Sequence, residues 1–280
     1  MKQNAPKKNN EDKFLISKLI DAGIEKQEAE KEISILIKEF GKNNLEEVQA
    51  IVNKRIETRI PLQYLLQKAY FMDFEVKVNE NVLIPRPETE ILVEESVKRL
   101  KKNDTSKITA LDIGTGSGII PIALAKLIPN IEIIAIDLKS EIIALAKQNA
   151  NNCGVSNKID FRACDLFSND FEELIKNNNF DLIISNPPYV RPSQLEKLSP
   201  EVYIHEPKIA LSGSRENSTG LIYYERIIKI LKNNVKCIIA LEIDPPLVND
   251  LKSLLKKEEL NNYEIIKDYA KLDRCLFIIL

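Results

Sequence analysis

Hydrophobic residues recur at helical spacing in the first quarter of the chain. Apolar positions three and four residues apart predict three helices, over residues 14–20, 29–40 and 45–56. Gly41 follows the second stripe in the position of a C-terminal cap, and Pro61 is typical of a helix end. We therefore expect an N-terminal helical domain over residues 11–68, behind a polar tail over residues 1–10.

Residues 69–84 change to a period of two. Phe74 and Val76 alternate with polar residues, as in a half-buried strand. Residues 79–81 are turn formers, which would leave residues 82–84 as a second strand. The pattern predicts a β-hairpin linker between the helical domain and the rest of the chain.

Beyond the linker, apolar strands alternate with amphipathic helices. We expect strands over residues 108–113, 131–136, 159–161, 180–185, 236–243, 263–266 and 275–280, and helices over residues 88–101, 119–127, 140–151, 221–231 and 247–255. The stretch 187–217 has no clear period and is expected to be irregular. This alternation predicts an α/β fold over residues 85–280, with a mostly parallel sheet covered on both faces. Ligands of such sheets bind at the carboxyl ends of the strands.

The first strand of this region runs into the glycine-rich segment Asp112–Gly118. Its three glycines permit a sharp turn and a close backbone approach to a ligand. Ile119 stands where a dinucleotide-binding loop needs its third glycine, and no Gly-Lys-Ser/Thr of a phosphate loop follows. The acidic Asp112 favours a cationic ligand over a pyrophosphate.

Acidic residues also follow the next two strands. Asp137 comes 19 residues after Gly118, where a carboxylate accepts both hydrogen bonds of a ribose diol. Asp165 could accept a hydrogen bond from an adenine amino group, and Leu166 could contact the ring.

The fourth strand ends in the tetrapeptide Asn186–Tyr189, with the sequence Asn-Pro-Pro-Tyr. The two prolines fix the backbone and lack an N–H group, so the local carbonyls are acceptors without a neighbouring donor. Asn186 adds a side-chain carbonyl, and Tyr189 offers a flat face to a planar group. The segment therefore suits the capture of an NH₂ group by both of its hydrogens.

Composition limits the possible partners. The 280 residues include 40 Lys and Arg against 42 Asp and Glu, a net charge of −2, so no global basic field exists for nucleic acid. Four cysteines without a Cys-x-x-Cys pair and one histidine provide no common zinc set. No apolar run approaches the roughly 20 residues of a membrane span, and the basic N-terminus has no apolar stretch directly behind it. We expect a cytoplasmic protein without a metal or a membrane partner.

Together these motifs resemble the class I S-adenosylmethionine-dependent methyltransferases and, within them, the release factor glutamine methyltransferases. The resemblance extends over nearly the whole chain and is carried by Pro61–Tyr64, Leu83–Glu90, Leu111–Gly118, Asn186–Tyr189, Glu206–Pro207 with Ala210–Leu211, and Gly220–Leu221 with Tyr224. The tetrapeptide is shared with methyltransferases of nucleic-acid bases and so indicates the target nitrogen. The segment 84–90, behind a helical lobe, is what indicates the glutamine enzymes.

The resemblance implies a Rossmann-like sheet with an N-terminal substrate-recognition domain. It implies methylation of the glutamine side-chain amide in the Gly-Gly-Gln motif of a peptide chain release factor, with S-adenosylmethionine as methyl donor. With the positions above, the expected cofactor-binding residues are Asp112, Gly114, Thr115, Gly116, Ser117, Gly118, Asp137, Asp165, Leu166 and Asn186. The expected substrate-binding residues are Arg86, Glu88, Asn186, Pro187, Pro188 and Tyr189, of which Asn186, Pro187 and Tyr189 are the catalytic candidates. We expect a monomer that makes no direct contact with nucleic acid.

The chain departs from the family pattern at three places. Gln67 replaces a usual glycine, residues 212–219 form a longer loop, and Asp244–Pro246 stand where a glycine and later a glutamine are expected. All three lie away from the expected chemistry and bear on substrate docking.

Three alternatives remain open. A nucleic-acid base methyltransferase would use the same acceptors on adenine N6 or guanine N2 after base flipping, although a net charge of −2 counts against it. A non-enzymatic scaffold on the same fold is disfavoured by the intact Asn186–Tyr189 segment. A nicotinamide oxidoreductase is disfavoured by Ile119.

Overall fold

The structure is a computed structural model that describes residues 10–41, 44–100, 107–216, 218–232 and 237–280. The chain forms two compact units, one of residues up to Leu66 with Pro200–His205 and one of Gln67–Ser199 with Glu206–Leu280. Of the polar tail expected over residues 1–10, all but Asn10 lies outside the described residues, and Asn10 begins the first helix.

The smaller unit is helical, as the apolar stripes predicted. Its helices are α1 (Asn10–Asp21), α2 (Lys26–Phe40), α3 (Leu45–Thr58), α4 (Leu62–Leu66) and α9 (Pro200–His205). The stripes of the first helices share one core, in which Leu19, Ile33 and Val52 are almost fully buried. The buried Arg55 of α3 donates to Glu32 of α2 at 3.1 Å and to Glu201 of α9 at 3.2 Å. This ion pair holds the distant segment α9 in the unit.

The hairpin lies earlier in the chain than the alternating pattern over residues 69–84 predicted. Strands β1 (Lys68–Phe71) and β2 (Phe74–Lys77) pair antiparallel, with Met72 at a positive φ of 50° in the tight turn between them. The expected second strand over residues 82–84 is wrong, because these residues form no strand in the described chain, although Val82 and Ile84 are buried. Their burial, rather than strand pairing, explains the apolar pattern there.

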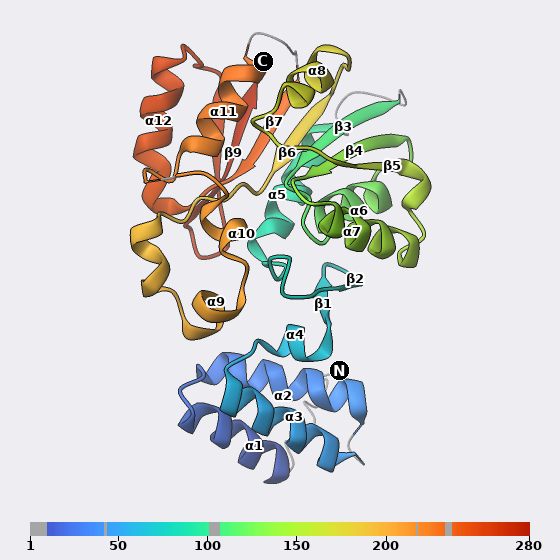
Figure 1. The fold of residues 1–280 in the computed structure, drawn as a ribbon, viewed down its shortest axis with the longest axis vertical. Helices are drawn as coiled ribbons and strands as arrows, with labels where there is room; N and C mark the ends of the chain where they lie inside the picture. Colours follow the sequence, from blue (N-terminus) through green and yellow to red (C-terminus); the bar gives the residue numbers. More distant parts are fainter. Residues whose placement is uncertain (1–9, 42–43, 101–106, 217, 233–236) are drawn as a thin grey trace, which may run out of the picture. The chain divides into compact units, whose positions relative to one another are not determined.

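The larger unit contains the predicted α/β sheet (Figure 1). Its strands are β3 (Ile108–Ile113), β4 (Ile131–Asp137), β5 (Ile159–Ala163), β6 (Leu182–Ser185), β7 (Ile238–Glu242), β8 (Tyr263–Lys267) and β9 (Asp273–Ile279). They lie in the order β5-β4-β3-β6-β7-β9-β8, and the five strands from β5 to β7 run parallel while β9 is antiparallel to both neighbours. The predicted fold class is therefore confirmed.

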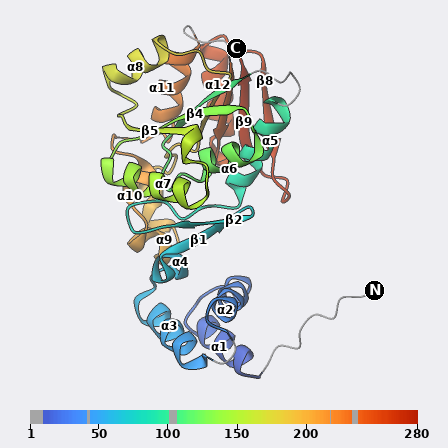
Figure 2. The ribbon, with the colours of Figure 1, turned by 90° about the vertical axis from the view of Figure 1, so that its right-hand side faces the viewer.

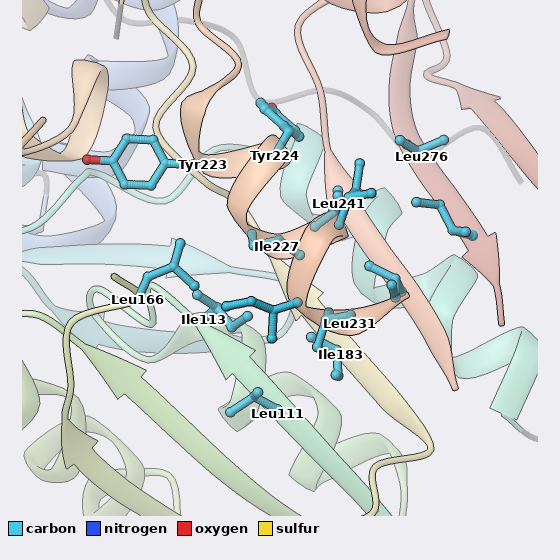
Figure 3. Packing of buried hydrophobic residues seen from close by; sticks show 14 of the residues in the cluster. Leu111, Ile113, Leu166, Ile183, Tyr223, Tyr224, Ile227, Leu231, Leu241 and Leu276 are labelled. Atoms are coloured by element: carbon cyan, nitrogen blue, oxygen red, sulfur yellow. The ribbon is translucent and has the colours of Figure 1, made fainter. Parts of the chain in front are cut away.

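Helices cover both faces of this sheet (Figures 1 and 2). One layer contains α5 (Glu88–Leu100), α6 (Ile119–Leu127) and α7 (Ser140–Asn152), and the other contains α8 (Asn169–Lys176), α11 (Ile222–Leu231) and α12 (Val248–Lys257). Figure 3 shows Ile227 and Leu231 of α11 packed against strand residues such as Ile183. No helix in the described ranges is long and apolar enough to cross a membrane.

The stretch 187–217, expected to be irregular, contains short helices in its described part. They are the 3₁₀ helix Pro192–Lys197, α9 and α10 (Lys208–Ser212). Each spans only five or six residues. Such short helices hold too few apolar repeats for a helical period to be recognised. Helix α8 was also missed, and its apolar face is formed by Phe171, Leu174 and Ile175.

Candidate functional site

Four parallel strands of the sheet end at the same level. Ile113 of β3 pairs with Ile136 of β4 and with Ser185 of β6. Ser185 in turn pairs with Leu241 of β7. The next residues along these strands are Gly114, Asp137, Asn186 and Glu242. The order of the strands reverses between β3 and β6, so these residues lie at the carboxyl ends of the strands, at the topological switch point where α/β sheets bind ligands.

A cavity lies at this edge of the sheet. It is lined by eleven of the predicted site residues: Arg86, Gly114, Thr115, Gly116, Ser117, Asp137, Asp165, Leu166, Asn186, Pro187 and Pro188. The other predicted residues, Asp112, Gly118, Glu88 and Tyr189, are not among its lining. Segments separated by about a hundred residues in sequence are thus brought together around one space.

The glycine loop is held in place by its own backbone. Gly114 and Gly116 have positive φ angles of 76° and 55°, which favour glycine. The amides of Gly114 and Thr115 both donate to the carbonyl of Ile136 at 2.9 Å. A Cβ atom on Gly114 or Gly116 would meet no described atom within 4 Å. The loop therefore presents bare backbone to open space beside the cavity.

Asp137 links this loop to the end of β4. Its carboxylate accepts from the amide of Gly116 at 2.9 Å and from the amide of Leu138 at 2.7 Å. Burial raises the pKa of Asp137, although these backbone donors lower it in part. The Lys139 amide is a third backbone donor to this carboxylate. A carboxylate has about four acceptor positions, so at least one remains for a further donor.

Asp112 lies under the loop and is fully buried. Neither of its carboxylate oxygens has a well-formed hydrogen bond to a described residue, although the Thr115 hydroxyl lies close enough to lower the pKa of Asp112 in part. Burial raises the pKa of Asp112 to about 7. A buried acceptor of this kind is normally satisfied by a bound group or an ordered water.

The proline corner, residues 186–189, faces the glycine loop across the switch point. The side-chain amide nitrogen of Asn186 donates to the hydroxyl of Thr89 at 3.3 Å. Pro187 and Pro188 line the cavity, whereas the Tyr189 ring packs against the core cluster around α11 and α12. Burial raises the pKa of Tyr189 well above its ordinary value, so its phenol stays protonated.

Asp165 is already engaged within the chain. One of its oxygens accepts from the amide of Phe167 at 2.9 Å, and the other accepts from the guanidinium of Arg215 at 3.1 Å. That guanidinium also lies 4.7 Å from the centre of the Phe167 ring. An adenine amino group at Asp165 would have to share this carboxylate with Arg215.

Sequence reasoning missed several residues that shape the site. Asn149 of α7 is fully buried and donates to the carbonyl of Ser117 at 2.8 Å. It also bonds to both backbone groups of Lys77, at 2.8 Å and 2.9 Å, and so joins the glycine loop to the hairpin, which lies beside α7 (Figure 2). An asparagine in a helix carries no local sign of such a role.

The cavity has further walls to which the sequence analysis assigned no role, formed by Ile209, Ala210, Ser214 and Tyr223. Ser214 belongs to the loop 212–219, so the expectation that this loop lies away from the site is wrong. Arg86 forms a 2.6 Å ion pair with Glu206, and the side chain of this glutamate is almost fully buried. The family resemblance had singled out Glu206 without a role, and the structure shows that it fixes Arg86 at the cavity.

Known proteins are similar to most of the chain. A "Methyltransferase domain" family model matches residues 104–275, and a protein-L-isoaspartate(D-aspartate) O-methyltransferase model matches residues 30–168. A solved METTL16 methyltransferase domain has a TM-score of 0.53 at 16% identity, covering 73% of this chain and 87% of that one, which supports the fold.

The release factor glutamine methyltransferase of Clostridium acetobutylicum is 32% identical, over 86% of this chain and 82% of its own length. That of Flavobacterium psychrophilum is 37% identical, over 79% of this chain and 76% of its own length. The chain therefore belongs to the release factor glutamine methyltransferase family.

Proposed function

We propose that this protein methylates the glutamine side-chain amide in the Gly-Gly-Gln motif of a peptide chain release factor, with S-adenosylmethionine as the methyl donor. The observation that carries the proposal is the proline corner at the switch-point cavity, directly across from an open glycine loop. Membership of the family supplies the substrate class, and the geometry supplies a reason why a planar amide fits.

The residues present fit S-adenosylmethionine. Gly114 and Gly116 leave open space where side chains would stand, and Asp137 lines the cavity with at least one acceptor position left for the ribose. The bound donor supplies an electrophilic methyl group on a positively charged sulfur. We propose that Leu166, which lines the cavity, packs on its adenine ring, while Asp165 binds the amino group in competition with Arg215.

The proline corner would activate a poor nucleophile. An amide nitrogen reacts slowly because its lone pair is delocalised into the carbonyl. We propose that the side-chain oxygen of Asn186 and the backbone carbonyl of Pro187 each accept one hydrogen of the target amide. Acceptors held in this way favour the positive charge that develops on the nitrogen. The proton can leave after the transfer, so the residues need not include a strong base.

Positioning is the other contribution. Pro187 and Pro188 have restricted backbones, so little ordering is left to occur when the substrate binds. Holding two reactants in line can remove about 7–11 kcal/mol from a barrier. We propose that Arg86 contacts the substrate at the cavity mouth. Tyr189 and Glu88 do not line the cavity, so we propose that they support this contact from the adjoining segments rather than line the site.

The remaining expectations concern partners and location. We propose that the helical unit, residues 11–68 in the sequence prediction, helps to hold the release factor. We expect the protein to act as a monomer in the cytoplasm, without direct contact with nucleic acid. A nucleic-acid base would meet the same acceptors, but the net charge of −2 provides little attraction for its backbone.

The test is a comparison of methyl acceptors. The purified protein is incubated with S-adenosylmethionine labelled in its methyl group and with a release factor, ribosomal RNA or duplex DNA. We expect label in the release factor alone. Label in either nucleic acid, with none in the release factor, would contradict the proposal in favour of the base methyltransferase.

A further inference from the structure

A chain of hydrogen bonds runs from the proline corner into the interior. The amide nitrogen of Asn186 donates to the hydroxyl of Thr89 at 3.3 Å, and this hydroxyl donates to a carboxylate oxygen of Glu242 at 2.6 Å. Thr89 belongs to the first turn of α5, and Glu242 is the last residue of β7. Both are buried, at 1% and 3% exposure. Three segments far apart in sequence therefore meet at the side chain expected to bind the substrate.

The direction of these hydrogen bonds decides which end of the Asn186 side-chain amide faces the cavity. The oxygen and nitrogen ends of an asparagine side chain have nearly the same shape, so only hydrogen bonding distinguishes them. An ionised carboxylate can only accept, so Glu242 obliges the Thr89 hydroxyl to donate toward it. The hydroxyl oxygen then accepts from Asn186, and the side-chain oxygen of Asn186 is left for another donor.

We propose that Thr89 and Glu242 are positioning residues, which keep the side-chain oxygen of Asn186 turned toward the target amide. This inference rests on the proposed function, because it explains how the acceptor used in methyl transfer is presented. In the reversed orientation the NH₂ group of Asn186 would face the NH₂ group of the substrate, and no hydrogen bond could form between them.

The protonation of Glu242 gives this arrangement a pH dependence. Burial is the main cause that raises the pKa of Glu242 to about 7, while the Thr89 hydroxyl lowers it in part. The other groups that act electrostatically on Glu242, or that it acts on, are Glu88, Arg86, Arg274, Tyr189, Tyr224 and Cys275. Above this pKa, ionised Glu242 fixes the direction of the hydrogen bonds. Below it, protonated Glu242 can donate to the Thr89 hydroxyl. That hydroxyl can then donate to the side-chain oxygen of Asn186, which would turn this oxygen away from the cavity.

The first test compares two substitutions at Thr89. Thr89→Val keeps the shape of the side chain and removes the hydroxyl, whereas Thr89→Ser keeps the hydroxyl. We expect Thr89→Val to lower kcat for release factor methylation about 10- to 100-fold, as is typical when the partner of a functional group is lost. We expect Thr89→Ser to restore kcat to within about threefold of the wild type. Calorimetry of S-adenosylmethionine binding should give the same Kd for all three proteins, which checks that the cofactor site is intact.

The second test follows kcat from pH 6 to 8.5 in the wild type and in Glu242→Gln, with S-adenosylmethionine saturating. Glutamine can accept from Thr89 or donate to it at every pH, so it no longer selects a direction. We expect the ratio of wild-type to variant kcat to rise through about pH 7, the pKa of Glu242, and to level off above it. Saturation keeps the titration of Asp112, also near pH 7, from entering through cofactor binding.

The outcomes separate this inference from the proposed function. If the wild type methylates the release factor and Thr89→Val retains its kcat, the positioning role is wrong and the proposed function stands. A ratio that does not change with pH likewise overturns the role of Glu242. If the wild type transfers no methyl group to the release factor, both the proposed function and this inference fail.

Discussion

The two loops that meet at the switch-point cavity are held in different ways. The glycine loop after β3 is fixed mainly through its backbone: Gly114 and Gly116 have positive φ angles, and the loop amides donate to Ile136 and Asp137 at the end of β4. One side chain from further away, Asn149 of α7, donates to the Ser117 carbonyl. The proline corner after β6 depends on side chains from other segments, since Asn186 is bound by Thr89 and, through it, by Glu242. Cofactor binding should therefore respond to changes near the loop, and methyl transfer should respond to distant residues as well.

The largest effect is expected at Asn186. Asn186→Ala removes one of two acceptors for the target amide, so the rate of methyl transfer to a release factor should fall about 10²–10³-fold, as for the loss of one preorganised polar group. The Kd for S-adenosylmethionine should rise far less than the rate falls, because Asn186 is only one of the expected cofactor contacts and the glycine loop is untouched. The rate is measured with labelled cofactor and the Kd by calorimetry.

A second asparagine provides the control for this variant. Asn178 donates to the carbonyl of Leu174 at 2.8 Å, at the end of α8, and does not line the cavity. Asn178→Ala should transfer methyl groups at the wild-type rate. Near-normal transfer by Asn186→Ala would show that Asn186 does not act as an acceptor for the target amide.

A smaller effect is expected at Asp137, on the cofactor side. Asp137→Ala removes the acceptor proposed for the ribose diol and the anchor of the Gly116 amide. Hydrogen bonds to a charged group contribute about 1.5–3 kcal/mol, so the Kd for S-adenosylmethionine should rise about 10- to 100-fold. Calorimetry measures this directly.

Asp181 offers a matched carboxylate away from the cavity. It accepts from the backbone amide of Thr109 at 2.8 Å and is exposed. Asp181→Ala should leave the Kd unchanged. If Asp137→Ala also binds S-adenosylmethionine as tightly as the wild type, the ribose assignment is wrong.

The smallest effect concerns the stability of the glycine loop. Gly118 has a φ of +85°, and a Cβ atom there would lie 3.2 Å from the Cβ of Ala146 on α7. An L-residue in this conformation costs about 1–2 kcal/mol, so Gly118→Ala should lower the free energy of unfolding by at least this amount. Urea unfolding followed by circular dichroism measures the change.

Gly154 separates the conformational cost of a positive φ from the cost of the close contact with α7. It has a φ of +71°, but a Cβ atom there would meet no described atom within 4 Å. Gly154→Ala should therefore show the conformational cost alone. Equal losses in the two variants would mean that the contact between Gly118 and α7 contributes nothing.

The sequence alone was informative where structure is encoded locally. The glycine loop, Asp137 and the Asn-Pro-Pro segment each follow a strand with a clear apolar pattern, and the parallel register brings them to one edge. Short-range patterns were less informative elsewhere. The hairpin turn was expected at residues 79–81 but lies at Met72, because alternation shows that a strand exists and does not say which neighbour it pairs with.

Other parts of the site could not be read from a local pattern. Thr89 looks like an ordinary residue of a helix start, and its bond to Glu242 spans 153 positions in the chain. Asn149 is a buried polar residue in an amphipathic helix, and its bond to Ser117 depends on how α7 packs. Such contacts exist only once the sheet and its helices are assembled, so no window of sequence contains them.

The central claim is that the proline corner binds a planar NH₂ group through both of its hydrogens. It is tested most directly by peptide mass mapping of a release factor after incubation with this protein and S-adenosylmethionine, beside a release factor in which the glutamine of the Gly-Gly-Gln motif is replaced by glutamate. We predict one added methyl group on that glutamine and none on the glutamate variant, which has no side-chain NH₂ group to donate. A methyl group on another residue, or equal methylation of both release factors, would contradict the claim.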